Sequence, residues 1–338
     1  MKAIVLRAHD PSPRALEYVT DWPDPVAGEG NVVIAVRACA LNYHDLFTLR
    51  GMPGIKVPMP IITGIDMAGE IVEVGPGVTG FTVGDRVLVD PFDRVAGKLI
   101  GEMMNGGLAE YCEVGAHTLL PLDDAISFED AAALPTAYGT AYRMIRRRGR
   151  VARDEKVLVL GASGGVGTCC VQLAAAEGAH VIAAASTAEK LARLEELGAH
   201  ELINYVEHDF REAIIAKHGK PRMFGGGGID VIVNFTGGDT WAPSLRTLTK
   251  GGRLLTCGAT AGFDPKTDIR YIWTFELNIL GSNGWAREDV EELLELVRQK
   301  KLRPMIDRVL PLEKAQEAFT LLDSREVFGK IIVSPTAA

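Results

Sequence analysis

The sequence has few cysteines, no long apolar run and no secretion signal. Its five cysteines are odd in number and scattered, with one adjacent pair: Cys39, Cys112, Cys169, Cys170 and Cys257. Such a set is a poor disulfide framework, so we expect reduced thiols. No apolar stretch approaches the roughly 20 residues of a membrane span, and no basic, apolar and small-residue succession follows Met1. These absences predict a cytoplasmic protein that does not enter a membrane.

An excess of basic residues is also missing. The net charge of −8 argues against a nucleic-acid-binding surface over the whole molecule. The one basic stretch runs from Arg143 to Arg153 and admits two interpretations. It is either a solvated helix end, where arginines favour the negative end of the helix dipole, or a guanidinium cluster that binds a phosphate of a cofactor or of coenzyme A.

The hydrophobic pattern changes along the chain and indicates two domains. A chain of 338 residues is longer than a domain with a single hydrophobic core usually is. Residues 1–122 show short β-like runs broken by Gly and Pro, whereas residues 123–264 alternate strand-like and helix-like runs, typical of a parallel sheet. We predict an α/β fold with a doubly wound parallel-sheet (Rossmann) nucleotide domain at 123–264. Residues 1–122 and 265–338 would form an irregular β-rich substrate domain.

The segment VLVLGASGGVG, Val157–Gly167, joins an apolar run to closely spaced glycines and an apolar-rich helix. A buried parallel strand has that apolar pattern, and the turn after it needs residues without a Cβ where backbone approaches a pyrophosphate. The helix N-terminus offers unpaired N–H groups to the phosphates, although a glycine turn without a ligand is the alternative. The spacing departs from G-x-G-x-x-G, because Ser163 stands where the second glycine normally falls. The predicted phosphate-binding residues are Gly161, Ser163, Gly164, Gly165, Val166 and Gly167.

The end of the second strand of this domain favours NADPH over NADH. NAD-binding folds place a carboxylate there for the adenosine ribose, about twenty residues after the glycines. Here HVIAAA ends at Ser186 without an acid, and Lys190 follows one helical turn later. A hydroxyl and an ammonium can hold a 2′-phosphate that a carboxylate would repel. Ser186 with Glu189 also fits a helix capping box, and both roles are compatible.

Two segments resemble the medium-chain dehydrogenase/reductase superfamily, and the likeness extends along nearly the whole chain. They are GIDMAGEIVEVGPGVTGFTVGDRV at Gly64–Val87 and GGLAEY at Gly106–Tyr111. The resemblance implies a GroES-like fold for the substrate domain and an oxidoreductase activity with a nicotinamide cofactor.

Zinc-dependent members of this superfamily place a cysteine, a His-Glu pair and another cysteine around a catalytic metal. At these positions the chain has Asn42, then Ile65 and Asp66, and no cysteine in Leu134–Tyr142. Catalytic zinc needs about three nitrogen, sulfur or carboxylate ligands, which this set does not supply. The four-cysteine lobe of zinc-binding relatives would lie at 89–106, where there is no cysteine. We therefore expect no metal, and the resemblance is closest to the zinc-free quinone oxidoreductases and 2-enoyl reductases.

The resemblance places four candidate catalytic residues beside the nicotinamide: Asn42, Tyr43, His44 and Asp66. Tyr43 and His44 can both donate hydrogen bonds, and His44 stands where zinc-dependent relatives keep a proton-relay hydroxyl. A structural histidine, bonded to backbone, is the alternative. We expect Asp45 to cap or anchor the loop and Cys39 to be a small buried residue.

Further cofactor contacts follow from the resemblance alone. Thr140 would face the nicotinamide and Tyr205 would lie near the adenine. Other residues would surround the ribose, carboxamide and phosphate: Asn234, Thr236, Gly258, Ala259, Asn283 and Lys330. Each position also has an ordinary structural explanation, such as packing or turn closure.

Together these observations predict an NADPH-dependent reductase that transfers hydride to a conjugated acceptor without a metal. The C=C of an enone, enoyl thioester or quinone is already activated and needs no Lewis acid. Two alternatives stay open. One is an alcohol or carbonyl dehydrogenase with a non-standard zinc site made of His44, Asp66 and Cys39, and the other is a non-catalytic NADPH-binding protein.

The predicted substrate is small and hydrophobic, because most of the residues expected to line the cleft are apolar or aromatic: Phe47, Met52, Phe92, Trp273 and Trp285, together with Arg270. The strand FELNILG, Phe275–Gly281, has apolar residues on both faces and would be a liability if left unpaired. This strand and the family likeness predict a homodimer joined edge to edge.

Overall fold

The computed structural model describes residues 1–335, and the chain forms two compact units. Unit 1 consists of Met1–Ala137 together with the chain from Val290 onward, and unit 2 consists of Tyr138–Asp289. The domains predicted from the sequence have different boundaries. Residues 123–137 belong to unit 1, where α2 packs against β3 and β5. Residues 265–289 belong to unit 2, because their strand extends the sheet of that unit.

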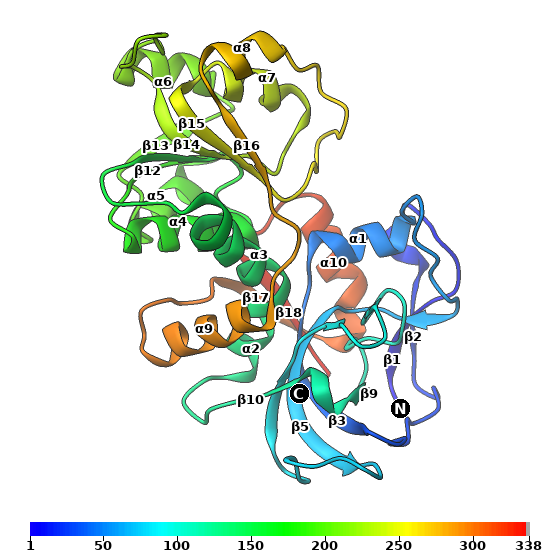
Figure 1. The fold of residues 1–338 in the computed structure, drawn as a ribbon. Coiled ribbons are helices and arrows are strands. Elements are labelled where there is room, and N and C mark those ends of the chain that lie inside the picture. The colour runs from blue at the N-terminus through cyan, green and yellow to red at the C-terminus, as the bar shows by residue number, and fades with distance from the viewer. Residues whose placement is uncertain (336–338) are drawn as a thin grey trace. The chain divides into compact units, whose positions relative to one another are not determined.

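Unit 1 is rich in β-structure (Figure 1). Its strands are β1 (Ala3–Leu6), β2 (Leu16–Val19), β3 (Asn31–Ala40), β4 (Ile61–Ile62), β5 (Asp66–Val74), β6 (Arg86–Val89), β7 (Phe92–Asp93), β8 (Lys98–Leu99), β9 (Tyr111–Gly115), β10 (Leu119–Pro121), β17 (Ile306–Pro311) and β18 (Lys330–Ser334). Its helices are α1 (Tyr43–Arg50), α2 (Phe128–Ala132) and α10 (Ala315–Asp323), and α9 (Arg287–Arg298) begins at the boundary.

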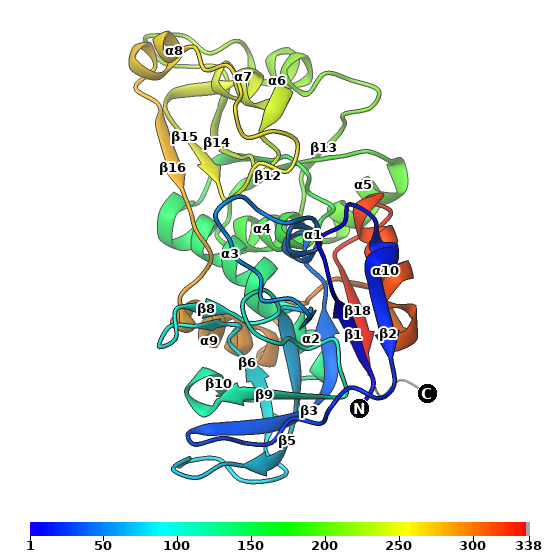
Figure 2. The same ribbon diagram turned by 90° about the vertical axis from the view of Figure 1, so that its right-hand side faces the viewer.

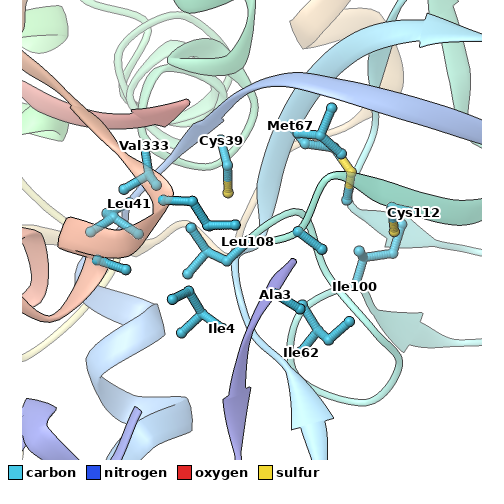
Figure 3. Packing of buried hydrophobic residues seen from close by; sticks show 14 of the residues in the cluster. Ala3, Ile4, Cys39, Leu41, Ile62, Met67, Ile100, Leu108, Cys112 and Val333 are labelled. Carbon is cyan, nitrogen blue, oxygen red and sulfur yellow. The ribbon is translucent and has the colours of Figure 1, made fainter. Parts of the chain in front are cut away.

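Strand β3 is the central element of unit 1. It pairs with β5, β9 and β18 in the sheet ordered β10-β6-β5-β3-β18-β17. Its sequence NVVIAVRACA is apolar on both faces, as expected for a strand covered on both sides. Strands β2, β1 and β4 form a second, antiparallel sheet. In the core between these strands, Leu108 lies with Cys39 on one side and Ile4 on the other (Figure 3).

Unit 2 contains a six-stranded parallel sheet with helices on both faces. Its strands, in the order β13-β12-β11-β14-β15-β16, are β13 (Glu201–Asn204), β12 (His180–Ala185), β11 (Lys156–Val159), β14 (Ile229–Val233), β15 (Leu248–Thr256) and β16 (Asn278–Gly281). The helices include α3 (Gly139–Tyr142), α4 (Gly165–Ala176), α5 (Ala188–Glu196), α6 (Phe210–His218), α7 (Trp241–Leu245) and α8 (Ile269–Thr274). A segment of wider π-helical turn covers Arg143–Gly149, and another, Leu134–Tyr138, spans the boundary between the two units.

The strand order and helix placement confirm the predicted doubly wound fold. Helices α4 and α5 lie on one face of the sheet, and α6, α7 and α8 lie on the other (Figures 1 and 2). On the second face, Ile214 of α6 and Leu245 of α7 pack in one cluster with Ile232 of β14. From β11 the chain adds strands first on one side, β12 and β13, and then on the other, β14, β15 and β16. Folds with such a change of direction bind dinucleotides at the carboxyl ends of the strands beside it. No helix among the described residues is long and apolar enough to cross a bilayer.

Strand β16 corrects one prediction directly. The sequence segment FELNILG was assigned to the substrate domain, but Asn278–Gly281 pairs in parallel with β15 and forms the outer strand of the unit 2 sheet. The reason is tertiary, since periodicity within a short apolar strand does not say which sheet it joins.

Candidate functional site

The glycine turn of unit 2 is shaped to admit a phosphate. Gly161 has a φ of 67°, in the left-handed region that favours glycine. A Cβ on Gly167 would lie 2.4 Å from the carbonyl oxygen of Gly161, so only glycine lets α4 approach the turn this closely. Gly164 is the N-cap of α4 and supplies no side-chain acceptor to the first turn. The backbone N–H groups at Gly165, Val166 and Gly167 are therefore available to an anion, and the site fits a dinucleotide pyrophosphate.

Six of the predicted cofactor positions follow the carboxyl ends of different parallel strands. Gly161 follows β11, Ser186 follows β12, Tyr205 follows β13, Asn234 follows β14, Gly258 follows β15 and Asn283 follows β16. Because carboxyl ends of parallel strands share one edge of a sheet, these residues lie along one rim of unit 2. Tyr205 is 45% exposed there, and Thr140 is buried in α3.

Asn234 organises the loop after β14. Its side chain is buried, with Oδ1 accepting from the backbone N–H groups of Thr236 and Gly237, each at 3.0 Å. Its Nδ2 donates to Thr240 Oγ1 and Ser244 Oγ at 3.1 and 3.0 Å. Both the oxygen and the nitrogen of the Asn234 side-chain amide are therefore hydrogen-bonded within its own loop. A contribution of Asn234 to cofactor binding would come through the backbone that it holds.

The end of β12 differs from the sequence prediction in its cap. The residue at the N-cap of α5 is Thr187, whose Oγ1 accepts from the backbone N–H of Lys190 at 3.2 Å. Ser186 therefore does not cap this helix, and the predicted capping box at Ser186 and Glu189 is wrong. The positions flanking Ser186 are Ala185 and Thr187, so no acid stands at the strand end.

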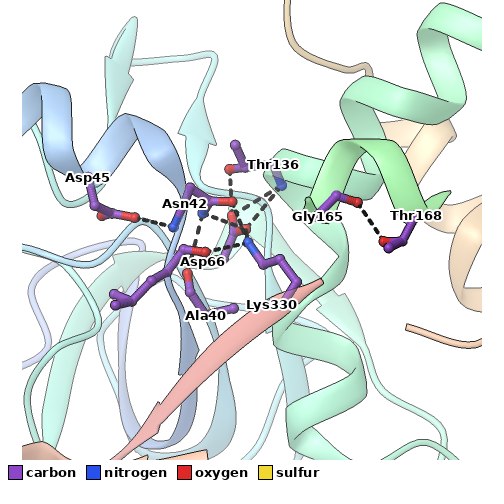
Figure 4. A network of polar contacts seen from close by, with 9 residues as sticks. Ala40, Asn42, Asp45, Asp66, Thr136, Gly165, Thr168 and Lys330 are labelled. Atoms are coloured by element: carbon purple, nitrogen blue, oxygen red, sulfur yellow. Dashed lines mark hydrogen bonds and ion pairs between the residues drawn. The ribbon is translucent and has the colours of Figure 1, made fainter. Parts of the chain in front are cut away.

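A buried polar cluster in unit 1 joins Asn42, Asp66, Thr136 and Lys330 (Figure 4). Nδ2 of Asn42 donates to Asp66 Oδ2 at 2.9 Å. The hydroxyl and backbone N–H of Thr136 donate to Asp66 Oδ1 at 2.7 and 3.2 Å. The Lys330 ammonium donates to Asn42 Oδ1 and, at 2.7 Å, to Leu41 O, and lies 3.8 Å from Asp66 Oδ2. The cluster brings together two of the predicted catalytic residues.

Lys330 was predicted from the resemblance to bind the cofactor, but the structure places its ammonium inside this cluster. The side chain is buried and its charge faces Asp66. Burial raises the pKa of Asp66 and lowers the pKa of Lys330, and each group's charge opposes the shift of the other. Asn42 and Lys330 thus hold the carboxylate of Asp66 as a paired, hydrogen-bonded group.

Tyr43 and Asp45 lie on helix α1, beside this cluster, and the structure gives them different surroundings. Oδ2 of Asp45 accepts from the backbone N–H of Asn42 at 2.7 Å, which confirms the expected capping role. Burial raises the pKa of Asp45 to about 7. The ring of Tyr43 packs edge-on against Phe47, with centroids 5.3 Å apart. Tyr43 thus contacts the next turn of its own helix.

His44 contacts Glu102, a residue that sequence analysis missed. The imidazole Nε2 donates to Glu102 Oε1 at 2.7 Å, and Thr48 Oγ1 lies 3.4 Å from the same oxygen. Burial alone lowers the pKa of His44, but the hydrogen bond and negative charge of Glu102 outweigh it, so the pKa is raised. No spacing rule links positions 44 and 102, so only the fold reveals the pair. The backbone-bonded histidine considered as the alternative is not what the structure shows.

Glu102 belongs to the lobe, residues 89–106, where the resemblance places the four cysteines of zinc-binding relatives. Asp90 pairs with Arg94, and Oδ1 of Asp93 accepts from the backbone N–H groups of Val95 and Ala96. The same oxygen lies 2.8 Å from His117 Nε2. Hydrogen bonds to the carboxylates of Asp90 and Asp93 therefore stabilise the lobe.

No three His, Cys, Asp or Glu side chains between residues 1 and 335 gather closely enough to hold a metal ion. The non-standard zinc site suggested from His44, Asp66 and Cys39 is accordingly not assembled. Cys39 is fully buried, and burial raises its thiol pKa well above the ordinary value, in agreement with a packing role.

The arginines after α3 are paired within unit 2. Arg143 and Arg147 both contact the buried carboxylate of Asp289, at 3.4 and 3.0 Å. Arg146 pairs with Glu177 at 2.7 Å, and Arg148 donates to Gly281 O at 2.9 Å. Four of the six arginines in the stretch thus have partners within unit 2, and Arg147, Arg148, Arg150 and Arg153 are exposed, as expected for a solvated helix end.

The predicted cleft residues are divided between the two units. Phe47, Met52 and Phe92 belong to unit 1, and Arg270, Trp273 and Trp285 belong to unit 2. Trp285 packs over Gly139, where an added Cβ would lie 2.9 Å from the Trp285 Cβ. Arg270 is paired with Asp268 at 2.8 Å, and Trp273 is exposed on α8.

Two family models match the chain. Residues 28–124 match the alcohol dehydrogenase GroES-like domain, and residues 165–299 match the zinc-binding dehydrogenase domain. An acryloyl-coenzyme A reductase of Sulfurisphaera tokodaii is 30% identical, with 99% of this chain and 100% of the relative covered. A quinone oxidoreductase-like protein 2 homolog of Nematostella vectensis is 31% identical, with 91% of this chain and 82% of the relative covered.

Solved structures of similar proteins have the same fold. A structure described as an NAD-dependent alcohol dehydrogenase has a TM-score of 0.90 at 34% identity, with 99% of each chain covered. The 2-octenoyl-CoA carboxylase reductase CinF, in complex with NADP and 2-octenoyl-CoA, has a TM-score of 0.85 at 26% identity, covering 100% of this chain and 88% of CinF.

Proposed function

Because this chain belongs to the medium-chain dehydrogenase/reductase superfamily and is an oxidoreductase, we propose that it is an NADPH-dependent reductase acting on a conjugated acceptor without a metal. The acceptor would be an enone, an enoyl thioester or a quinone. Homologues named acryloyl-coenzyme A reductase, crotonyl-CoA reductase and quinone oxidoreductase-like protein support a reductase of this class.

The observation that carries this proposal is the Asn42, Asp66 and Lys330 cluster. Two of the positions that hold zinc in metal-dependent relatives are here bonded to each other, and a buried ammonium pairs with both. A divalent cation placed among these groups would have to displace the Lys330 charge. The electrophile must then be activated by its own conjugation and by hydrogen bonds from the chain.

The preference for NADPH rests on the end of β12. Ser186 follows the strand without a neighbouring carboxylate, and Thr187 takes the capping role, so the Ser186 hydroxyl is not needed for the helix. A hydroxyl at this point suits a 2′-phosphate, whereas a carboxylate would repel it. The complex of CinF with NADP supports the same choice.

A reduced nicotinamide, when bound, would supply the hydride for the β-carbon of the acceptor. The chain's own contribution is to hold the acceptor's oxygen and to return a proton. His44 is the better candidate for that proton than Tyr43, because the buried carboxylate of Glu102 holds its imidazole at 2.7 Å. The names of the relatives favour an enoyl thioester among the three acceptor classes.

Steady-state kinetics with the purified protein test this function. We expect oxidation of NADPH by short enoyl-CoA thioesters, with kcat/KM for NADPH at least tenfold above that for NADH. Metal analysis of the same preparation should find less than stoichiometric zinc, and chelation should leave the rate unchanged. Stoichiometric zinc lost together with alcohol oxidation on chelation would favour the dehydrogenase alternative. Tight NADPH binding without turnover on enones, enoyl thioesters, quinones or aldehydes would favour the non-catalytic alternative.

A further inference from the structure

The imidazole of His44 is held at one nitrogen by a carboxylate that burial isolates from water. The Glu102 side chain is 2% exposed, whereas that of His44 is 30% exposed. Phe47, one turn later on α1, packs edge-on against the imidazole with centroids 6.0 Å apart. With Nε2 bonded to Glu102, Nδ1 is the nitrogen left to serve a ligand.

Close packing of the lobe restricts the position of the Glu102 backbone. A Cβ on Gly106 would lie 2.2 Å from Gly64 O, and one on Gly101 would lie 2.6 Å from the same oxygen. The backbone on both sides of Glu102 therefore packs directly on the turn that leads into Asp66. The N–H of Gly101 donates to Met104 O at 2.8 Å, which closes the loop around Glu102.

Carboxylates from three parts of unit 1 contribute negative charge at His44. Glu102 approaches from the lobe, Asp45 from α1 and Asp66 from β5. The buried ammonium of Lys330, on β18, pairs with Asp66. This arrangement favours a protonated ring, and Glu102 is the group in direct contact with it.

We propose that Glu102 is a positioning residue that keeps His44 doubly protonated, with Nε2–H bonded to Glu102 and Nδ1–H presented to the acceptor. This inference rests on the proposed function. As the acceptor's α-carbon takes the proton, the Nδ1–H bond breaks and a C–H bond forms with the electron pair left by hydride addition at the β-carbon. His44 becomes neutral with Nε2–H still donated to Glu102, and solvent water returns a proton to Nδ1.

Two variants and two readouts test the role of Glu102. The Glu102→Gln variant keeps a hydrogen-bond acceptor but removes the charge, and Glu102→Asp restores the charge at shorter reach. In the wild-type protein without substrate, NMR titration of the histidine ring signals gives the midpoint of His44. We expect Glu102→Gln to lower this midpoint by about one pH unit or more and Glu102→Asp to recover part of the shift.

The pH profile of the reductase should follow the NMR midpoint. We expect kcat with an enoyl thioester at pH 7.5 to fall by roughly 10- to 100-fold in Glu102→Gln, with the acceptor KM changed little. The alkaline limb of kcat/KM should move to lower pH by the same interval as the NMR midpoint. Glu102→Asp serves as the second variant if Glu102→Gln does not fold.

A matched control is available in unit 2, where Glu201 contacts His180 and His218 at 2.5 and 3.1 Å. Glu201→Gln removes the same kind of histidine contact and should leave the His44 midpoint and the rate unchanged. An unchanged His44 midpoint in Glu102→Gln overturns the proposal, and so does a lowered midpoint with an unmoved alkaline limb. Absence of turnover by the wild-type enzyme on every acceptor would instead refute the proposed function, while the NMR titration still reports on the pair.

Discussion

At the scale of single residues, unit 1 holds several charges that are costly to bury. Asp45, Asp66, Glu102 and Lys330 all have little or no exposure. Desolvation of an ionised group is offset only by opposite charge and hydrogen bonds, so each of these residues depends on a specific partner. Substitutions that remove a partner should therefore have larger effects than substitutions of surface charges.

Lys330→Met removes the ammonium that pairs with Asp66. We expect it to reduce the free energy of unfolding by about 3–5 kcal/mol, because the buried carboxylate loses its counter-charge. The loss should shrink as pH falls, since Asp66 can then take up a proton. Urea unfolding at pH 5 and pH 8 measures both effects. Lys314→Met, which breaks only an exposed 3.9 Å pair with Glu317, should cost no more than about 1 kcal/mol.

The buried carboxyl group of Asp45 makes the free energy of unfolding depend on pH. Its pKa is raised by burial from the ordinary 3.8 to about 7, and its Oδ1 has no hydrogen-bond partner. The folded state therefore binds a proton that the unfolded state releases above pH 3.8, so this contribution to stability is lost as pH rises through about 7.

The variant Asp45→Asn should be insensitive to that proton. We expect the unfolding free energy of the wild type, relative to the variant, to fall by up to about 1.4 kcal/mol per pH unit between pH 4 and pH 7. Denaturant unfolding across this range measures it, with the exposed Asp24→Asn as control. Parallel curves for wild type and Asp45→Asn would contradict the assignment.

At the scale of elements, the structure separates the roles of two adjacent hydroxyls at the start of α5. Thr187 caps the helix and Ser186 precedes the cap. Thr187→Ala should lower the free energy of unfolding by about 1 kcal/mol, whereas Ser186→Ala should leave it nearly unchanged.

Cofactor affinity should depend on Ser186 more than on Thr187. Ser186→Ala should weaken NADPH binding by roughly tenfold and leave NADH binding unchanged, because the lost contact is to the 2′-phosphate. Thermal unfolding and titration of each variant with both cofactors measure the two effects. Equal losses for NADPH and NADH would count against a phosphate contact at Ser186.

At the scale of the whole molecule, β16 leaves one edge of the unit 2 sheet exposed. Strand β16 pairs with β15 on one side only, and Ile279 is 36% exposed. An outer strand with apolar side chains favours pairing with a second copy. We expect a dimer at micromolar concentration by light scattering, and Ile279→Lys should shift it toward monomer. A wild-type monomer under these conditions would contradict the expected edge pairing.

The sequence by itself determined the fold class and the cofactor turn, because both depend on local pattern. An apolar run followed by Gly161, Gly164 and Gly167 has few structural meanings, and strand-helix alternation after it specifies a parallel sheet. The missing acid after β12 and the capping role of Asp45 could also be read locally. The residues predicted around the cofactor lie at the ends of successive strands because such positions recur at one edge of this sheet.

Only the tertiary structure decided which distant side chains meet. Lys330 reaches Asn42 across almost the whole chain, and Glu102 reaches His44 from a separate lobe, because β18 pairs with β3 and the lobe closes on Gly64. Strand β16 likewise belongs to a sheet that its own sequence pattern did not predict. Contacts of this kind depend on the register and packing of remote elements, which impose no spacing on the sequence.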